Sequence, residues 1–247
     1  MDRFNAIDTV ARRLRVARRI TVMTGAGVSA ASGVPTFRGP GGLWRSFRPE
    51  ELATPEAFAH DPHLVWEWYD WRRGLIATCA PNVAHEVLAR WSQRPGFTLI
   101  TQNVDGLHES CGSRNVIRFH GSIWRLRCWD ACGRPEWEDR IVPIEPLPPR
   151  CPDCGGLARP AVVWFGEAID PRVLHACNQA SECDVFLSIG TSSVVYPAAG
   201  LVHAAKRRGA FTVEINSQAT EAALAVDMAI ELPAEDALPP IDVIWNA

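Results

Sequence analysis

The sequence of 247 residues lacks any apolar run as long as the about 18 residues that a membrane-spanning helix needs. It also has little net charge, −3 at pH 7, and therefore no excess of basic residues that would favour nucleic acid as a partner. Internal repeats and low-complexity tracts are absent as well. These absences exclude a transmembrane helix and give no electrostatic reason to expect direct nucleic-acid binding.

The composition is that of an ordinary soluble globular protein, with 47% hydrophobic and 21% charged residues. A chain of 247 residues suits one α/β domain with a modest insertion. No signal peptide precedes the eight cysteines, so we expect a cytoplasmic, reducing environment in which metal binding or burial is more common than disulfides. We further expect a monomer.

Residues 8–19 have the pattern of an amphipathic helix, with Val10 and Leu14 on one side and arginines on the other. An arginine-rich presequence is the alternative interpretation. The acidic Asp2 and Asp8 argue against it, so we expect a structural helix.

Short continuous apolar runs alternate with helical stretches along most of the chain. Continuous runs of this length are typical of strands that are buried on both faces of a parallel sheet. The expected strands are residues 20–23, 97–101, 184–189, 211–215 and 228–232, and the expected helices are residues 82–90, 171–182 and 197–208. The alternation predicts an α/β fold with a Rossmann-like, doubly wound parallel sheet that binds ligands at the carboxyl ends of its strands.

Two regions interrupt this pattern. Residues 41–80 are rich in aromatic side chains and predict a helical insertion, whereas residues 121–166 hold paired cysteines and a proline-rich stretch. We therefore expect a large dinucleotide-binding domain and a small composite domain. The expected boundaries are residues 1–40, 81–120 and 167–247 for the large domain, 41–80 for the helical insertion and 121–166 for the small domain.

Two cysteine pairs, Cys128 with Cys132 and Cys151 with Cys154, lie about twenty residues apart, and each pair is followed by glycine. Two such pairs can close a tetrahedral zinc site, and four cysteine ligands leave no open position for catalysis. We therefore expect one structural zinc ion; the alternative is four free or buried thiols. Burial is expected for the remaining cysteines, Cys79, Cys111, Cys177 and Cys183.

A glycine-rich turn follows the first expected strand. Gly25 and Gly27 would let backbone amides approach a diphosphate, and the helix that follows would offer its positive N-terminal end. Many glycine turns only reverse the chain, but this one leads into a rigid, aromatic and cationic segment, residues 35–39 (PTFRG).

Polar side chains follow other expected strands. Residues 101–108 (TQNVDGLH) come directly after the second strand, although a capped helix start would look similar. Residues 190–193 (GTSS) and 214–217 (EINS) suit hydrogen bonding to phosphate and ribose oxygens, or are only turns. His120 lies between a strand-like run and Gly121, at the boundary of the two domains where clefts form; a lone histidine is more often structural.

Taken together and in this order, the motifs from Gly25 to the strand at Phe211 resemble the sirtuins, the NAD-dependent protein deacylases. The resemblance implies transfer of an acyl group from lysine to ADP-ribose, with release of nicotinamide and O-acyl-ADP-ribose. It implies that His120 is the general base, that Phe37 shields the anomeric carbon, and that Asn103 and Asp105 act with Arg38 on the nicotinamide, the ribose and a nearby water.

The same resemblance supplies a set of cofactor contacts. The implied NAD-binding residues are Gly25, Ala26, Gly27, Ser29, Phe37, Arg38, Trp44, Gln102, Asn103, Asp105, Gly190, Thr191, Ser192, Asn216 and, for the adenine, Asp227. The cysteine module departs from the family, because three residues separate Cys128 from Cys132 where sirtuins usually have two.

The substrate side of the resemblance involves two segments. Residues 159–167 (RPAVVWFGE) match the segment that pairs with the substrate peptide, except that Ala161 replaces the usual histidine. The residues implied to contact the peptide are Val162, Val163, Trp164, Phe165 and Gly166. Tyr69 and Arg72 match the signature of the class III, desuccinylase-like branch, and their spacing on a helix would place them on one face, where they could bind an acyl carboxylate. A surface arginine beside a core tyrosine is the alternative.

Two other functions remain open from the sequence. The first is mono-ADP-ribosyl transfer to a different acceptor, and the second is a non-catalytic NAD-sensing or zinc-scaffold module. The presence of both His120 and Asn103 argues against the second, because a pure binding protein needs neither.

Overall fold

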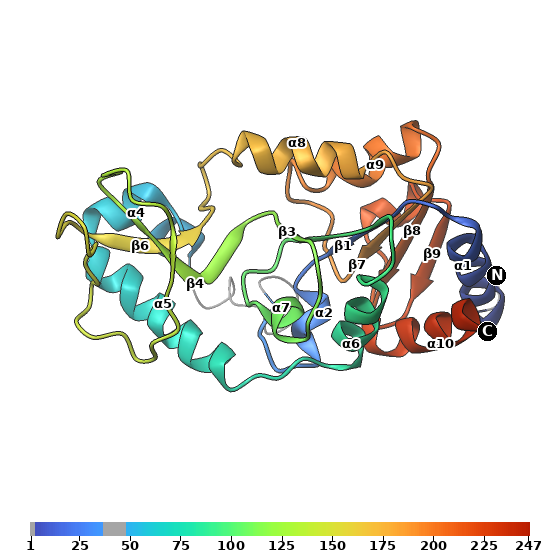
Figure 1. The fold of residues 1–247 in the computed structure, drawn as a ribbon, viewed down its shortest axis with the longest axis horizontal. Coiled ribbons are helices and arrows are strands. Elements are labelled where there is room, and N and C mark those ends of the chain that lie inside the picture. Colours follow the sequence, from blue (N-terminus) through green and yellow to red (C-terminus); the bar gives the residue numbers. More distant parts are fainter. Residues whose placement is uncertain (1–2, 37–47) are drawn as a thin grey trace.

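The computed structural model describes residues 3–36 and 48–247 and has two parts, one at each end of an elongated molecule (Figure 1). The larger part is built on a six-stranded parallel sheet with the strand order β3-β2-β1-β7-β8-β9. Its strands are β1 (Ile20–Thr24), β2 (Phe97–Thr101), β3 (Val116–Arg118), β7 (Val185–Ile189), β8 (Phe211–Asn216) and β9 (Met228–Glu231). The Rossmann-like fold class predicted from the sequence is thereby confirmed.

The strand order reverses between β1 and β7, which are neighbours in the sheet although a long stretch of chain separates them. Ligands of open parallel sheets bind outside the carboxyl ends of the strands at such a switch point. The turn after β1, residues 25–27, and the turn after β7, residues 190–192, both lie there.

Helices cover both faces of the large sheet (Figure 1). On one face α1 (Arg3–Val16), α6 (Val83–Trp91) and α10 (Ala234–Asn246) close the main core, in which Val10 and Leu14 are fully buried as the amphipathic pattern predicted. On the other face lie α8 (Pro171–Ala180) and α9 (Gly200–Arg207). No helix among the described residues has both the length and the apolar character that crossing a membrane requires.

Several predicted boundaries were wrong by a few residues. The N-terminal helix begins and ends earlier than residues 8–19, and α9 begins at Gly200 because residues 196–199 form a turn instead of a first helical turn. The helix after the first glycine turn, α2 (Gly27–Ala30), has only four residues, so its contribution as an extended dipole is small. A second short helix, α7 (Leu107–Ser110), follows the polar segment after β2.

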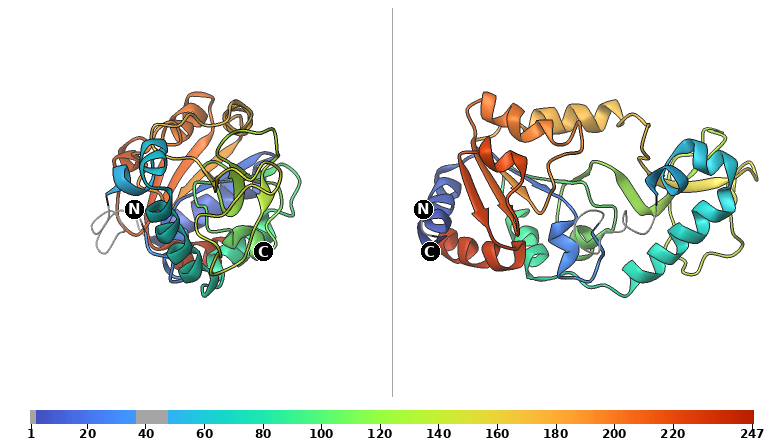
Figure 2. Two further views of the ribbon diagram at one scale, coloured as in Figure 1. Left: turned by 90° about the vertical axis from the view of Figure 1, so that its left-hand side faces the viewer. Right: turned by 180° about the vertical axis from the view of Figure 1, so that it is seen from behind.

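The smaller part combines an antiparallel sheet with helices, and it lies at the opposite end from α1 and α10 (Figure 2). Its strands, in the order β5-β4-β6, are β5 (Trp137–Glu138), β4 (Gly121–Cys128) and β6 (Ala158–Val162). Its helices are α3 (Pro49–Leu52), α4 (Pro55–His60) and α5 (Pro62–Ala77). Phe58 and Trp66 from the helices share one core with Ile123 and Trp164 from the strand region.

Local sequence explains where these helices begin. Thr54 and Asp61 accept hydrogen bonds from the first turns of α4 and α5, and a proline follows each cap at a position where no N–H is needed. Asn82 forms a capping box with His85 at the start of α6. The Asp61 cap fixes the start of α5, the helix that carries Tyr69 and Arg72.

The cysteines outside the paired module were predicted to be buried, and this was only half right. Cys177, in α8, and Cys183, between α8 and β7, are buried in one core, whereas Cys79 and Cys111 are partly exposed because each lies at a helix end. A short 3₁₀ helix, η2 (Glu221–Leu224), lies between β8 and β9.

Candidate functional site

A cleft of about 770 Å³ separates the two parts of the molecule and contains the ends of several strands. The large sheet contributes Gly25, Gln102, Thr191 and Asn216 to its wall, and residues of α5 and the segment after β6 line the rest. A cleft of this size is in the usual range for ligand sites, which is roughly 300–1,000 Å³. The predicted residues that line it are Gly25, Ala26, Gly27, Tyr69, Arg72, Gln102, Asn103, His120, Val162, Val163, Trp164, Phe165, Gly166, Gly190, Thr191, Ser192 and Asn216.

The two glycines of the first turn let it pack directly against the turn after β7. A Cβ atom on Gly25 would lie 2.8 Å from the carbonyl oxygen of Gly190, and one on Gly27 would lie 2.7 Å from the Cα atom of Gly190. The backbone N–H of Gly27 donates a hydrogen bond of 2.8 Å to the same carbonyl. Glycine is therefore required by contact between two backbones at the switch point, in addition to any approach of a diphosphate.

Asn103 is held in the cleft wall by buried neighbours. Its side-chain amide donates to the carbonyl of Gly25 at 3.0 Å and to the hydroxyl of Ser29 at 3.1 Å. Ser29 in turn donates to Asp105 at 2.8 Å, and the N–H of Leu107 donates to the other carboxylate oxygen at 2.9 Å. Within the part of the chain that the structure describes, Ser29 and Asp105 lie behind the cleft wall, so here they orient Asn103.

His120 faces the cleft from the end of the β3 strand region. Its Nδ1 atom lies 3.2 Å from the carbonyl oxygen of Gln102. Because a carbonyl only accepts, Nδ1 carries the hydrogen and the neutral ring keeps Nε2 as a proton acceptor. Burial lowers the pKa of His120, while the hydrogen bond to Gln102 opposes this effect. The ring is therefore neutral at pH 7, as a general base must be.

A pair of buried histidines lies behind Ser29 and Asp105. The rings of His85 and His108 pack in a tilted arrangement with their centroids 4.9 Å apart, and Nε2 of His108 lies 2.9 Å from the hydroxyl of Thr24. Burial lowers the pKa of His85 to about 3, with a further contribution from His108, and lowers the pKa of His108 to about 4. His85 was not among the predicted residues, because α6 contacts this region only through the tertiary fold.

This pair predicts loss of stability in mild acid. Unfolded histidine has a pKa of about 6.5, so below that pH the unfolded chain binds protons that folded His85 and His108 exclude until about pH 3 to 4. At pH 5 each histidine should lower the free energy of unfolding by about 2 kcal/mol relative to pH 7.5. Urea unfolding at both pH values measures the difference.

A matched variant isolates the contribution of the pair. His108→Gln should lessen the loss of stability between pH 7.5 and pH 5, whereas His175→Gln, at an exposed position of α8, should leave it unchanged. An unaltered pH dependence in His108→Gln would exclude the buried histidines as its cause.

The nucleotide side of the cleft is a set of connected strand ends. Gln102 donates to the hydroxyl of Thr191 at 3.0 Å, and Asn216 donates to the carbonyl of Thr191 at 3.0 Å. The wall continues into a segment that was only partly anticipated, residues 217–220, after β8. Its polar character and its place at a strand end were the available signals.

Four other predicted cofactor contacts stay predictions. Among the described residues Asp227 does not line the cleft; its carboxylate accepts from Thr212 and pairs with Lys206 at 3.0 Å, so an adenine contact stays a prediction. Phe37, Arg38 and Trp44 lie outside the described residues, and their proposed contacts stay predictions too.

The far end of the cleft contains Tyr69 and Arg72, side by side on α5. Both are buried in the protein and both line the cleft, so Arg72 is not a surface residue. The Arg72 guanidinium carbon lies 4.7 Å from the ring centroid of Trp68 and 5.8 Å from that of Tyr69. Burial raises the pKa of the Tyr69 phenol, with the Arg72 charge opposing the shift, so Tyr69 stays protonated at neutral pH.

The segment after β6 forms the side of the cleft nearest to His120. Among the described residues β6 pairs with β4 alone and is therefore an edge strand, and an edge strand can accept an added peptide strand. The N–H groups of Val163, Trp164 and Phe165 already donate to His120, Glu167 and Ala53. Peptide pairing at these three residues would therefore use their carbonyl groups.

Ala161, where the resemblance leads one to expect histidine, is buried in β6. It pairs with Ser122 of β4, and its carbonyl oxygen would lie 2.1 Å from a Cβ atom on Gly121. Gly121 also has a φ of 81°. Glycine is therefore needed there both for this close approach and for the positive φ. Ala161 does not appear in the cleft wall of the described structure, so its contacts are those between β4 and β6.

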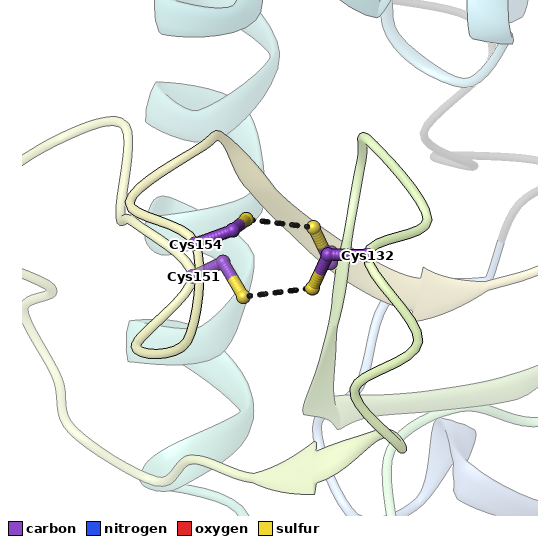
Figure 3. Close-up of side chains that lie close together, drawn as sticks. Cys132, Cys151 and Cys154 are labelled. Carbon is purple, nitrogen blue, oxygen red and sulfur yellow. Dashed lines mark hydrogen bonds between the residues drawn. The ribbon is translucent and has the colours of Figure 1, made fainter.

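The four paired cysteines converge as their spacing predicted. Sγ atoms of Cys128 and Cys154 are 3.5 Å apart, those of Cys132 and Cys151 are 3.7 Å apart, and all four lie within 4.8 Å of one another. Figure 3 shows Cys132 opposite Cys151 and Cys154. A tetrahedral zinc with Zn–S bonds of about 2.3 Å requires sulfurs about 3.8 Å apart, so the residues fit the ion.

The extra residue in the first pair is accommodated by the loop. Ala131 adopts a φ of 49°, which turns the chain so that Cys132 returns toward Cys128. On the other side a tight turn, in which the N–H of Gly155 donates to the carbonyl of Cys151 at 2.9 Å, brings Cys154 close. The departure from the usual spacing therefore leaves the four-thiolate cluster intact, and four sulfur ligands define a structural site.

A parallel sheet with a glycine turn at its switch point, a histidine facing the cleft and a four-cysteine module defines a two-part, NAD-using enzyme class. The family model described as "Sir2 family" matches residues 25–197, so the chain belongs to the Sir2 family, the sirtuins. The NAD-dependent protein deacylase of Aquifex aeolicus is 52% identical over 211 residues, covering 85% of this chain and 87% of the relative.

Solved structures agree with this assignment. A Sir2 homologue in complex with NAD has a TM-score of 0.90 and 42% identity, covering 97% of this chain and 93% of its own. Sir2Af2 bound to a myristoylated histone peptide has a TM-score of 0.79 and 30% identity, covering 98% of this chain and 97% of its own.

Proposed function

We propose that this sirtuin removes short dicarboxylic acyl groups, succinyl and malonyl, from lysine side chains of proteins in preference to acetyl groups. The enzyme is an NAD-dependent protein deacylase, as its curated relatives are named. The acyl preference depends on one observation, the presence of Tyr69 and Arg72 together in the wall of the cleft.

The general chemistry follows from the arrangement of the cleft. When bound, NAD supplies the ADP-ribose group that accepts the acyl group as nicotinamide leaves. The turns at residues 25–27 and 190–192 bind its polar groups, and Asn103 is held at the wall next to them. His120, neutral and with Nε2 unprotonated, takes a proton from a hydroxyl group in the cleft.

The acyl preference follows from charge. Arg72 is always cationic, and a guanidinium matches the geometry of a carboxylate, with which it can form two parallel hydrogen bonds. The protonated phenol of Tyr69 can donate a third hydrogen bond. Hydrogen bonds to charged groups contribute about 1.5–3 kcal/mol, which is roughly a ten- to hundredfold preference for a succinyl over an acetyl group.

Mass spectrometry of acetyl-, succinyl- and malonyl-lysine peptides incubated with and without NAD tests this proposal. The expected product is free lysine, formed only with NAD and fastest from the dicarboxylic acyl groups. Addition of ADP-ribose to the peptide in place of acyl removal would instead indicate mono-ADP-ribosyl transfer.

The variant Arg72→Met should lower the ratio of desuccinylation to deacetylation by roughly ten- to hundredfold, mainly through a higher KM for the succinyl peptide. Methionine keeps an unbranched apolar chain and removes the charge. Arg172→Met, which changes an exposed arginine at the start of α8, is the control and should keep the ratio. If both acyl substrates lose activity equally in Arg72→Met, Arg72 supports the fold and the acyl preference is not explained by it.

A further inference from the structure

The hydroxyl of Tyr69 has a buried hydrogen-bond partner in the cleft wall, the side chain of Trp164. The indole N–H of Trp164 donates to it at 2.8 Å, and both side chains are only 2% exposed. An indole nitrogen can only donate, so the phenol oxygen must be the acceptor of this bond. The contact connects α5 with the segment after β6.

Trp164 is held in place independently of any acyl group. The guanidinium carbon of Arg159 lies 3.3 Å from the centroid of the indole ring, and Phe58 packs at 5.4 Å. The backbone N–H of Trp164 donates to Glu167 at 2.8 Å, and Glu167 is paired with Arg159 at 2.6 Å. The indole N–H therefore points to a position determined by the protein alone.

The direction of this bond restricts where the phenol proton can point. A phenol has one O–H and accepts through its oxygen, so a donor fixed on one side leaves the O–H to be directed away from that donor. The Tyr69 ring is in the cleft wall next to Arg72, so the direction away from Trp164 includes the space that an acyl carboxylate would occupy.

We infer that Trp164 is a positioning residue for acyl specificity. Its indole N–H donates to the phenol oxygen of Tyr69, and this bond orients the phenol O–H toward the carboxylate of a dicarboxylic acyl group. This inference rests on the proposed acyl preference and adds a residue that is outside the Tyr69–Arg72 pair. Trp164 would act through Tyr69. Because the phenol O–H is already oriented before the substrate binds, the hydrogen bond to the carboxylate forms without the entropy cost of ordering the phenol.

The sharpest test replaces only the N–H. Site-specific incorporation of 3-benzothienylalanine at position 164 keeps the shape of the indole and exchanges its N–H for sulfur, and Trp164→Phe is a second, genetically simple variant. Kinetics with succinyl- and acetyl-lysine peptides of one sequence give KM and kcat for each. We expect the succinyl-to-acetyl ratio of kcat/KM to fall about three- to tenfold, through the KM for the succinyl peptide.

Tyr69→Phe provides the matched cycle. If Trp164 acts through the Tyr69 hydroxyl, the change at position 164 should have no further effect on the ratio when Tyr69→Phe is already present. An undiminished effect in that background, an unchanged ratio in both position-164 variants, or equal loss on both acyl groups would each overturn the inference.

The outcomes also separate this inference from the proposal beneath it. If the unmodified enzyme has no preference for succinyl peptides, the proposed acyl preference itself fails. If that preference exists and Tyr69→Phe lowers it while the benzothienyl enzyme retains it in full, the acyl preference stands and only the role of Trp164 is wrong.

Discussion

His120→Ala is expected to lower kcat for NAD-dependent deacylation by roughly 10²–10⁴-fold, the usual effect of removing a general base. The reason is geometric as well as chemical. The Gln102 carbonyl lies 3.2 Å from Nδ1 and so leaves Nε2 unprotonated, in a ring that lines the cleft. Deacylation of the preferred acyl-lysine peptide, measured by mass spectrometry under saturating NAD, gives the loss directly.

Two comparisons separate the loss of a base from the loss of a binding site. NAD affinity should change little in His120→Ala, because the turns at residues 25–27 and 190–192 are unaffected. Exchange of labelled nicotinamide should persist in His120→Ala but be lost in Asn103→Ala, whose amide connects the first glycine turn to Ser29. His175→Ala, on the exposed side of α8, is the matched control. Near-native turnover in His120→Ala would refute the assignment.

The pH profile gives a further readout of the same residue. Burial lowers the pKa of His120, so the ring loses its proton at a lower pH than free histidine, whose pKa is about 6.5. A base works only when it is unprotonated, so kcat/KM should fall as the pH decreases through the lowered pKa. The midpoint of this acid limb is therefore expected below pH ~6.5.

The large sheet could be predicted from the sequence because its strands carry their own signal. A strand buried on both faces is a continuous apolar run, and all five predicted runs became strands of the sheet with ends that differ by at most a residue or two. β9 is the one of these five that is not buried on both faces, because it lies at the sheet edge and only Ile230 in it is buried. β3, at the other edge, is weaker in sequence because it has only three residues, one exposed and two partly exposed.

Residues at strand ends could also be predicted, because a polar group directly after a buried strand has to emerge at the ligand-binding edge. Gln102, Thr191 and Asn216 all do so and are joined by hydrogen bonds. What the sequence does not encode locally is which of these residues line the cleft. Ser29 and Asp105 belong to the same motifs, yet the fold places them behind Asn103.

Long-range contacts were the part that the sequence could not supply. The need for Gly25 and Gly27 comes from contact with Gly190, on a different strand end. The Trp164–Tyr69 bond joins residues that are 95 positions apart. Periodicity describes which side of an element is buried, but partners across elements depend on register and helix orientation, which appear only in the assembled fold.

Cys151→Ala is expected to remove the zinc ion and unfold the loops that the four thiolates hold together. Three cysteines leave zinc with an incomplete ligand set, and the binding free energy of a structural zinc, about 10–16 kcal/mol in zinc-finger peptides, is coupled to the folding of the segment around it. Metal analysis should give one zinc per chain in the unmodified enzyme and almost none in Cys151→Ala. Cys111→Ala, which changes a partly buried thiol outside the cluster, is the control and should keep its zinc.

The extent of unfolding in Cys151→Ala is limited by where the apolar contacts are. The loops between β4 and β6 contribute few residues to the hydrophobic core of the smaller part. Other residues of this core, Phe58, Trp66, Ile123 and Trp164, do not belong to these loops. Hydrogen exchange should therefore lose protection in residues 129–157 and keep it in the six-stranded sheet, which has cores of its own. Equal loss of protection in both parts would mean that the cysteine module stabilises the whole chain, and zinc retained at one per chain would mean that Cys151 is not a ligand.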